Sequence, residues 1–272
     1  SVDPDGDSVS YSYTWTVNSS PTSYNTDTVS GTDVDAQELW ECTVTPNDGT
    51  NDGSTGSSSI TIESALTDVL IIWDVDNSHT QALKTALESD GLTVDLSATS
   101  ETSYNGSNPS PTDYDVVIHL NGTTYVTDMP MSGQLALVDH VYNGGGFIHS
   151  EWNAYEIDQG RMNYMRNLTL FDRVSGTNGT YTWTAVSSQS SHPVLTGVPS
   201  SFSVGSGFNE GYVHPFLSEE AVVLMTYDDG DMVAVREWGS GRIVGFGHSG
   251  NWNNFATLSN ANIQQLYINA VN

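Results

Sequence analysis

The continuous apolar run at residues 69–73 constrains the fold of this chain more than any other stretch. A strand with one solvent-exposed face alternates apolar and polar side chains, whereas a strand covered on both faces, as in a parallel sheet, is apolar throughout. A helix is predicted directly after the run, because Asn77 or Ser78 can cap its start and Gly91 can end it. The run therefore indicates a central parallel strand followed by a crossover helix.

Predicted strands and helices continue to alternate after this point. Strands are predicted at residues 92–96 and 114–120, and helices at 132–143 and 261–271. Shorter β segments are predicted at residues 180–186, 221–227, 232–238 and 242–247. The β-α-β-β-α-β order predicts a doubly wound, flavodoxin-like α/β domain over residues 65–272.

Residues 1–64 follow a different pattern, in which single apolar and polar residues alternate. Every second residue of 9–17 is apolar, including Trp15, which is typical of a strand with one buried face. Further β runs contain Trp40 and Ile60 and are separated by Asn/Asp/Gly turns. The segment is predicted to be a small β-sandwich, and its Y-x-Y-x-W and W-x-C-x-V strands resemble the Ig-like or cadherin-like repeats of microbial surface proteins.

The resemblance implies strands upstream of the Trp15 strand, yet only residues 1–8 precede it. The sandwich is thus predicted to lack its first strands. An incomplete sheet exposes unpaired backbone groups that can accept a strand from another chain. Either a neighbouring copy supplies this strand, or a boundary cuts the repeat.

The turns of this first segment carry candidate calcium ligands. Asp3, Asp5 and Asp7 occupy alternate positions around a glycine turn. Asp48 or Asp52, in later turns, can complete the coordination shell of the ion. Carboxylate oxygens at this spacing suit Ca²⁺. The alternative is a plain solvated acidic turn, and an EF-hand is not expected because its bidentate glutamate is missing.

The stretch at residues 144–153 points to a candidate site in the second domain. A glycine run ends the predicted helix, and a short apolar strand then leads to His149, Ser150 and Glu151. Ligands of open α/β sheets bind at the carboxyl ends of the strands. We therefore expect a site where this strand ends.

Charge and composition exclude several classes of function. The chain has 33 acidic and 6 basic residues, for a formal net charge of -27, so nucleic-acid binding is not expected. Such a surface attracts cations or suits salty surroundings. The single cysteine, Cys42, excludes an intrachain disulfide and a cysteine-rich metal site. No apolar window reaches the about 18 residues of a membrane helix, so membrane insertion is not expected.

Residues 68–272 resemble the ThuA-like branch of the class I glutamine amidotransferase-like fold. The resemblance rests on short matches in the expected order: residues 69–72 followed by His79, 144–149, 192–197, Glu210 with Tyr212, and 241–248. It implies that four residues meet at the carboxyl edge of the sheet, namely His79, His149, Glu210 and His248. Such a cluster can ligate a metal, with His79 as a ligand, or act as general acid and base on a sugar-like substrate. The alternative is that the histidines cap strands and satisfy loop carbonyls.

Amidotransferase chemistry is not expected. It needs a nucleophilic cysteine in a G-x-C-x-G turn and a His-x-Glu pair, whereas residues 149–152 read H-S-E-W and His248 is followed by Ser249. Ser150 with His248 as its base is a serine-hydrolase alternative, but the glycines of a sharp elbow are missing.

Two functions fit these features. The first is a calcium-stiffened structural or adhesive module of an extracellular surface or filament, whose amidotransferase-like domain is a non-catalytic scaffold or glycan binder. Its partners would be copies of itself, neighbouring repeats or carbohydrate. The second is a secreted carbohydrate-active enzyme that uses the His/Glu cluster. The incomplete sandwich, the acidic surface and the missing nucleophile favour the first.

The favoured function, a surface or filament module, also predicts where the protein is located. An extracellular or cell-surface glycoprotein is expected, and sequons at Asn18, Asn105, Asn121, Asn167 and Asn178 fit that location or arise by chance in an Asn/Thr-rich chain.

Overall fold

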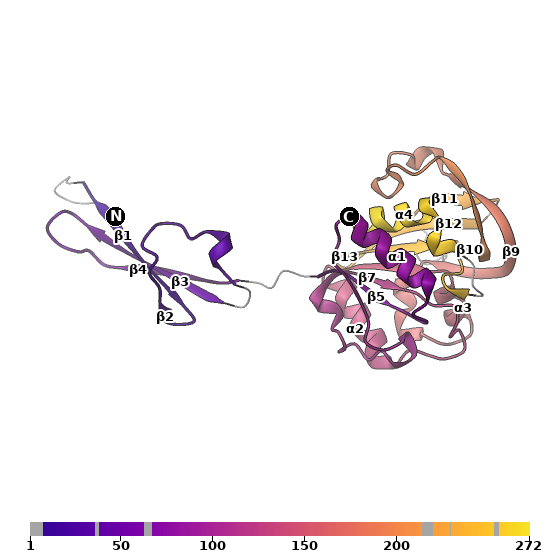
Figure 1. Ribbon diagram of the computed structural model, residues 1–272, viewed down its shortest axis with the longest axis horizontal. Coiled ribbons are helices and arrows are strands. Elements are labelled where there is room, and N and C mark those ends of the chain that lie inside the picture. The colour runs from indigo at the N-terminus through magenta and orange to yellow at the C-terminus, as the bar shows by residue number, and fades with distance from the viewer. Residues whose placement is uncertain (1–7, 36–37, 63–66, 214–219, 229, 253–255) are drawn as a thin grey trace. The chain divides into compact units, whose positions relative to one another are not determined.

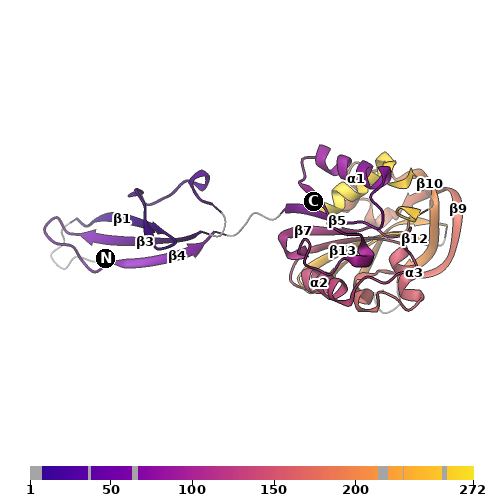
Figure 2. The ribbon, with the colours of Figure 1, turned by 60° about the horizontal axis from the view of Figure 1, so that its bottom comes forward.

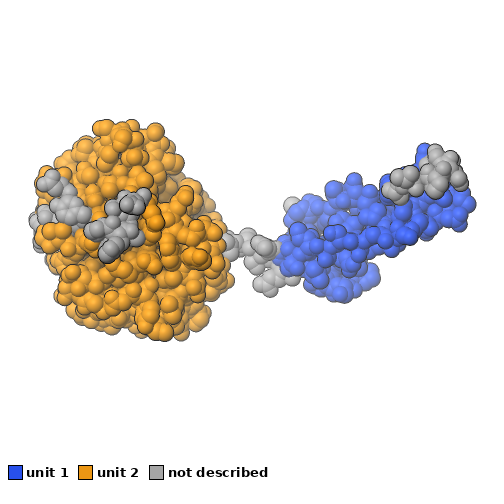
Figure 3. Space-filling model, turned by 180° about the vertical axis from the view of Figure 1, so that it is seen from behind, with its two compact units in different colours: residues 1–65 blue, residues 66–272 orange. Residues whose placement is uncertain are grey.

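The computed structural model describes residues 8–35, 38–62, 67–213, 220–228, 230–252 and 256–272. The chain divides into two compact units, Ser1–Ala65 and Leu66–Asn272 (Figure 3). Within the described ranges no helix is long and apolar enough to cross a membrane.

The first unit is a single antiparallel sheet of four strands in the order β2-β1-β3-β4 (Figure 1). Its strands are β1 (Ser10–Val17), β2 (Ser20–Pro21), β3 (Leu39–Asn47) and β4 (Gly56–Thr61). Trp40 is buried in its centre, and the rings of Trp15 and Tyr24 pack against it. The described residues are all-β, as predicted, but they form one sheet and do not show an Ig-like sandwich.

The connection between β2 and β3 covers part of the apolar face of this sheet. The indole Nε1 of Trp15 donates a hydrogen bond to Thr26 O over 2.9 Å. Farther along the sheet, Tyr11 is 47% exposed and Ile60 is 63% exposed. The alternation of apolar and polar residues in the sequence identified which face of the sheet is buried. It could not show that a loop, rather than a second sheet, covers that face.

The second unit is built on a nine-stranded sheet in the order β10-β9-β11-β12-β13-β8-β7-β5-β6. Its strands are β5 (Thr67–Ile72), β6 (Val94–Leu96), β7 (Tyr114–His119), β8 (Gly146–Ser150), β9 (Phe171–Ala185), β10 (Ser201–Val213), β11 (Ala221–Tyr227), β12 (Gly230–Trp238) and β13 (Gly241–Phe246). Strands β6, β5, β7, β8 and β13 pair in parallel. Numbered in chain order these five run 2-1-3-4-5, which fits the predicted flavodoxin-like domain.

Helices cover both faces of this sheet (Figures 1 and 2). They are α1 (Ser78–Ser89), α2 (Met131–Tyr142), α3 (Trp152–Asp158) and α4 (Ala261–Val271). Leu83 of α1 and Ile263 of α4 share one core cluster, and Leu137 of α2 and Ala154 of α3 share another. Residues 69–72 of β5 alternate between the two clusters, so this strand is buried on both faces and must be apolar throughout.

Element boundaries follow local signals where such signals exist. The side chain of Asn77 caps α1 by accepting from the backbone N–H groups of His79 and Thr80, and α4 has the predicted bounds. The sequence predicted neither α3 nor β10, and only the end of β9. The β9 and β10 hairpin is rich in Gly, Ser and Asn, which gives little apolar periodicity to detect.

Candidate functional site

Loops that follow four parallel strands bring buried polar side chains to the carboxyl edge of the sheet. Asp74 follows β5, Asn121 follows β7, Glu151 follows β8 and His248 follows β13, and all four side chains are buried. In a sheet of this strand order, ligands bind at this edge. The geometry of each residue therefore decides what the edge can do.

His149 is held neutral by the packing around it. Its Nδ1 donates to Ser150 O over 2.9 Å, and its Nε2 accepts from the backbone N–H of Leu170 over 3.1 Å. Burial lowers the pKa of the ring to about 4, with smaller contributions from His119 and Arg166. Because both ring nitrogens are bonded to the backbone, neither is free to exchange a proton with a substrate.

His248 is held in the same way. Its Nδ1 accepts from the backbone N–H of Gly250 over 2.9 Å, and its Nε2 donates to the Tyr267 hydroxyl over 3.0 Å. Burial, and to a smaller extent His149, lowers the pKa of this ring to about 3. The rings of Trp183 and Phe246 stack against it.

Ser150 does not form the nucleophile pair considered from the sequence. Its Oγ is buried and has no hydrogen-bond partner among the described residues, while both nitrogens of His248 are already bonded. Ser150 is the last residue of β8, and it is not among the described residues with a positive φ. This ordinary strand position differs from the strained turn that exposes a nucleophile in a hydrolase elbow.

The other two predicted residues of the His/Glu cluster are Glu210 and His79, and the structure describes fewer contacts for them. The backbone of Glu210 lies in β10 opposite Ser175. His79 lies in the first turn of α1, and its backbone N–H donates to Asn77 Oδ1. No group of three or more metal-binding side chains was found in the described parts of the chain. The structure thus places His149 and His248 at one edge, and the full cluster stays a prediction.

The predicted calcium ligands lie in the first unit. Asp3, Asp5 and Asp7 are outside the described residues. Asp48 Oδ1 accepts from the backbone N–H groups of Thr50 and Asn51, each over 2.7 Å, and Asp52 Oδ1 accepts from the Asn47 amide over 2.7 Å. The hydrogen bonds from Asn51 and Thr50 lower the pKa of Asp48. Both aspartates therefore shape their turn, and calcium binding stays a prediction.

Glu151 is the most unusual residue at the carboxyl edge. Its side chain is buried, and neither carboxyl oxygen has a hydrogen-bond partner within the described ranges. Burial raises the pKa of this carboxyl well above its ordinary value, and the positive charge of Arg173 opposes the shift only in part. Burial therefore favours the protonated, uncharged form of Glu151.

Several neighbours of Glu151 share its lack of partners. Polar side-chain atoms of five buried residues have no hydrogen-bond partner in the described structure, and we call these residues the Glu151 cluster: Ser150, Glu151, Trp152, Asn153 and Ser249. Each such group costs about 1–3 kcal/mol. A concentration of unpaired polar groups in one place calls for a functional explanation.

Aromatic rings border the Glu151 cluster. The Trp152 ring lies 5.1 Å from Tyr125, 4.8 Å from Tyr155 and 5.6 Å from Trp252, measured between centroids. These three neighbours are half-buried. The guanidinium of Arg173 lies 4.5 Å from the centroid of the Tyr155 ring.

The sequence pointed to the strand end that carries Glu151 but assigned the chemistry to His149, His248, Glu210 and Ser150. Hydrophobic periodicity and motifs cannot show which buried polar atoms lack partners, because the partners come from loops distant in the sequence. The signal that was available is an acidic residue directly after a buried strand, where burial perturbs its pKa.

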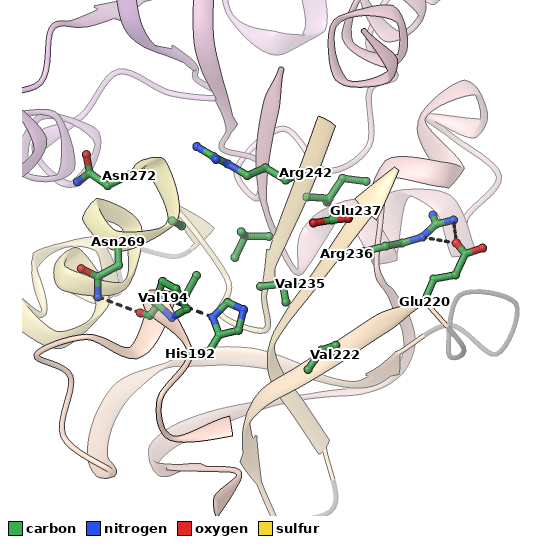
Figure 4. A pocket seen from close by; sticks show the side chains of 14 residues that line it. His192, Val194, Glu220, Val222, Val235, Arg236, Glu237, Arg242, Asn269 and Asn272 are labelled. Atoms are coloured by element: carbon green, nitrogen blue, oxygen red, sulfur yellow. Dashed lines mark hydrogen bonds and ion pairs between the residues drawn. The ribbon is translucent and has the colours of Figure 1, made fainter. Parts of the chain in front are cut away.

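Figure 4 shows a pocket of about 470 Å³ at a different place, between α4 and strands β11, β12 and β13. Val222 and Val235 line it together with His192 and the Arg236–Glu220 ion pair. None of the predicted catalytic residues lines this pocket.

Comparisons with known proteins identify the fold. No protein-family model and no curated protein matches the sequence. A ThuA-like protein from Bacteroides uniformis matches with a TM-score of 0.55 and 15% identity, over 74% of this chain and 87% of that one. A ThuA-like protein from Parabacteroides merdae matches with a TM-score of 0.51 and 15% identity, over 75% and 87%. The α/β unit therefore has a ThuA-like fold, and identities this low show the fold alone.

The predicted extracellular or cell-surface location is contradicted by a further comparison. A protein of Salmonella typhimurium that is described as cytoplasmic matches with a TM-score of 0.54 and 17% identity, over 86% of this chain and 94% of that one. A second Salmonella typhimurium protein, also described as cytoplasmic, matches with a TM-score of 0.53 and 13% identity. The location was inferred from an acidic, Asn/Thr-rich composition, which reflects the solvation of a surface and does not report a compartment.

Proposed function

We propose that the α/β unit binds an uncharged, polyhydroxylated ligand of the carbohydrate class at the Glu151 cluster and does not perform amidotransfer. One observation carries the proposal: both oxygens of the buried Glu151 carboxyl lack a hydrogen-bond partner among the described residues, beside other buried polar atoms in the same condition. A ligand that pairs with these groups would remove their cost.

The chemistry of the cluster suits sugar hydroxyls. A protonated carboxyl and an amide each donate and accept hydrogen bonds, as do the serine hydroxyls, and the Trp152 indole donates. Sugar hydroxyls donate and accept as well, and the apolar faces of sugar rings suit aromatic side chains such as Tyr125 and Trp252. A binding site of this kind combines apolar walls with a few placed polar groups.

Calorimetric titration of the full chain with neutral monosaccharides and oligosaccharides tests the proposal. Glu151→Met should weaken binding by about 5- to 30-fold, because losing one or two net hydrogen bonds costs about 1–2 kcal/mol. Glu88→Gln is the control, since Glu88 is partly exposed on α1 and its side chain pairs only with Lys84 among the described residues. Equal affinity for both variants, or no binding of any neutral sugar by the wild type, would contradict the proposal.

The raised pKa of Glu151 favours a second candidate, a carbohydrate-active enzyme with Glu151 as general acid. Burial of this carboxyl raises its pKa and so favours the protonated state that a glycosidase acid needs. Glu151→Gln distinguishes the two functions. It should retain an affinity near that of the wild type under either hypothesis, but it abolishes turnover of an activated glycoside only if Glu151 is the acid.

For the first unit we propose a role in joining copies of the chain. The edge strand β4 pairs on one side only, with β3, and carries the exposed Ile60, so a strand from a second copy can extend the sheet. Size-exclusion chromatography with light scattering, in millimolar calcium and then in chelator, tests assembly and calcium together. Calcium-dependent oligomers support both, oligomers in both buffers support assembly alone, and a monomer in both buffers contradicts assembly.

A further inference from the structure

Two loops close over the Glu151 cluster, and glycines bring them into contact. Residues 121–125 follow β7 and residues 249–252 follow β13. A Cβ atom at Gly250 would lie 2.7 Å from Asn121 O and 3.1 Å from Ser150 Oγ. A Cβ atom at Gly122 would lie 3.0 Å from the backbone of Ser249. The loops therefore approach each other too closely for a side chain at Gly250, and a side chain at Gly122 would require its neighbours to shift.

One buried carboxylate ties both loops to the sheet. Asp74 Oδ2 accepts from the backbone N–H of Thr123 over 2.7 Å, and Asp74 Oδ1 accepts from the Asn251 amide over 2.8 Å. The same Oδ1 also accepts from the backbone N–H of Val75 over 2.8 Å. Asn251 donates further to Thr80 Oγ1 over 2.9 Å. Asp74 thus contacts one residue of each covering loop from its place after β5.

The closed loops leave no open path for a ligand to the buried side chains of the Glu151 cluster. The side chains of Ser150, Glu151 and Asn153 are at most 1% exposed, so a ligand reaches them only when a covering loop moves. Burial raises the pKa of Asp74, and the hydrogen bonds from Asn251 and Thr123 oppose that shift. The bonds that hold the loops therefore also favour the charged form of the Asp74 carboxyl, against burial and the nearby charge of Glu101.

We propose that Asp74 is a latch that holds the 121–125 and 249–252 loops closed and so controls ligand access to the Glu151 cluster. The proposal rests on the proposed function only for the identity of the ligand. Opening breaks the bonds to Thr123 and Asn251 and exposes Trp152 and its polar neighbours. Closing restores these bonds and returns Ser249, which the 249–252 loop carries, to the cluster.

Hydrogen exchange in the full chain tests the latch without a ligand. In Asp74→Asn an N–H₂ group replaces one acceptor oxygen, so Thr123 or Asn251 loses its acceptor. Amides of residues 121–125 and 249–252 should exchange about tenfold faster, as expected when about 1.4 kcal/mol of closing free energy is lost. Asp76→Asn is the matched control, because Asp76 is an exposed neighbour that bonds only the Gln81 side chain in the described structure.

A second variant keeps the test decisive if Asp74→Asn does not fold. Asn251→Ala leaves Asp74 and its bond to Thr123 in place, so it should raise exchange at residues 249–252 more than at 121–125. Wild-type exchange at both loops in a folded variant overturns the latch. Faster exchange, with no neutral sugar bound by the wild type or by the opened variant, upholds the latch and overturns the proposed ligand class instead.

Discussion

The buried histidines and the Glu151 cluster lie at the same edge of one sheet, yet the histidines are fully hydrogen-bonded and Glu151 is not. His149 and His248 have both ring nitrogens bonded, whereas Glu151 has neither oxygen bonded within the described ranges. All three side chains are buried and have shifted pKa values. Burial and a shifted pKa therefore do not distinguish Glu151 from the two histidines, whereas hydrogen-bond satisfaction does.

The largest expected effect comes from removing a satisfied histidine. His248→Leu leaves the Gly250 N–H and the Tyr267 hydroxyl without partners, so the free energy of unfolding should fall by about 2–5 kcal/mol. His192→Leu is the matched control, because this ring is half-exposed and its only hydrogen bond in the described structure is to the Val194 N–H. Urea unfolding measures both variants, and an equal loss would contradict the structural role of His248.

The two histidines also predict how stability depends on pH. Their folded pKa values are lowered to about 4 and about 3, below the ordinary value of about 6.5. Between about pH 6.5 and pH 4 these two histidines bind protons in the unfolded chain but not in the folded chain, so their contribution to stability falls as pH falls. Each histidine contributes a slope of up to about 1.4 kcal/mol per pH unit.

Comparing the wild type with His248→Leu in about 1 M salt at several pH values isolates the contribution of His248. Salt screens repulsion among the surface carboxylates, and both proteins keep the opposing contributions of the buried carboxyls with raised pKa, Glu151 and Glu156. The same pH dependence in both proteins between pH 6.5 and 4.5 would mean that the His248 ring accepts a proton in the folded state, and would return it to consideration as a catalytic group.

The smallest expected change in stability is an increase, in the variant Glu151→Met. Glu151→Met replaces an unsatisfied buried carboxyl with an apolar group, and we expect the free energy of unfolding to rise by about 1–2 kcal/mol. Glu156→Met is the matched comparison on the same helix, because Glu156 is buried but pairs with Arg161. Breaking that pair should destabilise the protein by about 2–4 kcal/mol, less than for a fully buried pair because Arg161 is partly exposed.

Thermal and chemical unfolding of the two glutamate variants at pH 7 makes this comparison. A loss of stability in Glu151→Met as large as that in Glu156→Met would show that the Glu151 carboxyl has a partner and would remove the main support for the binding site.

Local patterns in the sequence predicted much of the fold. The apolar run in β5 indicated a strand buried on both faces, and Asn77 and the period of residues 261–271 located α1 and α4. The predictions failed where the pattern was weak or where another segment decided the outcome. The β9 and β10 hairpin has few apolar residues, and the Ig-like sandwich was inferred from strands that the structure places in a single sheet.

The sequence by itself determined that the larger part of the chain forms a doubly wound sheet and that β8 ends in polar residues, because hydrophobic periodicity and glycine positions are local properties. Only the tertiary structure decided which of these polar residues are satisfied. The partners of His248 and Asp74 come from segments distant in the sequence, such as Tyr267 for His248 and Thr123 and Asn251 for Asp74. Hydrogen bonds between distant segments form only once the sheet brings the loops together, so the distinction between a packing histidine and an unpaired glutamate cannot be read along the chain.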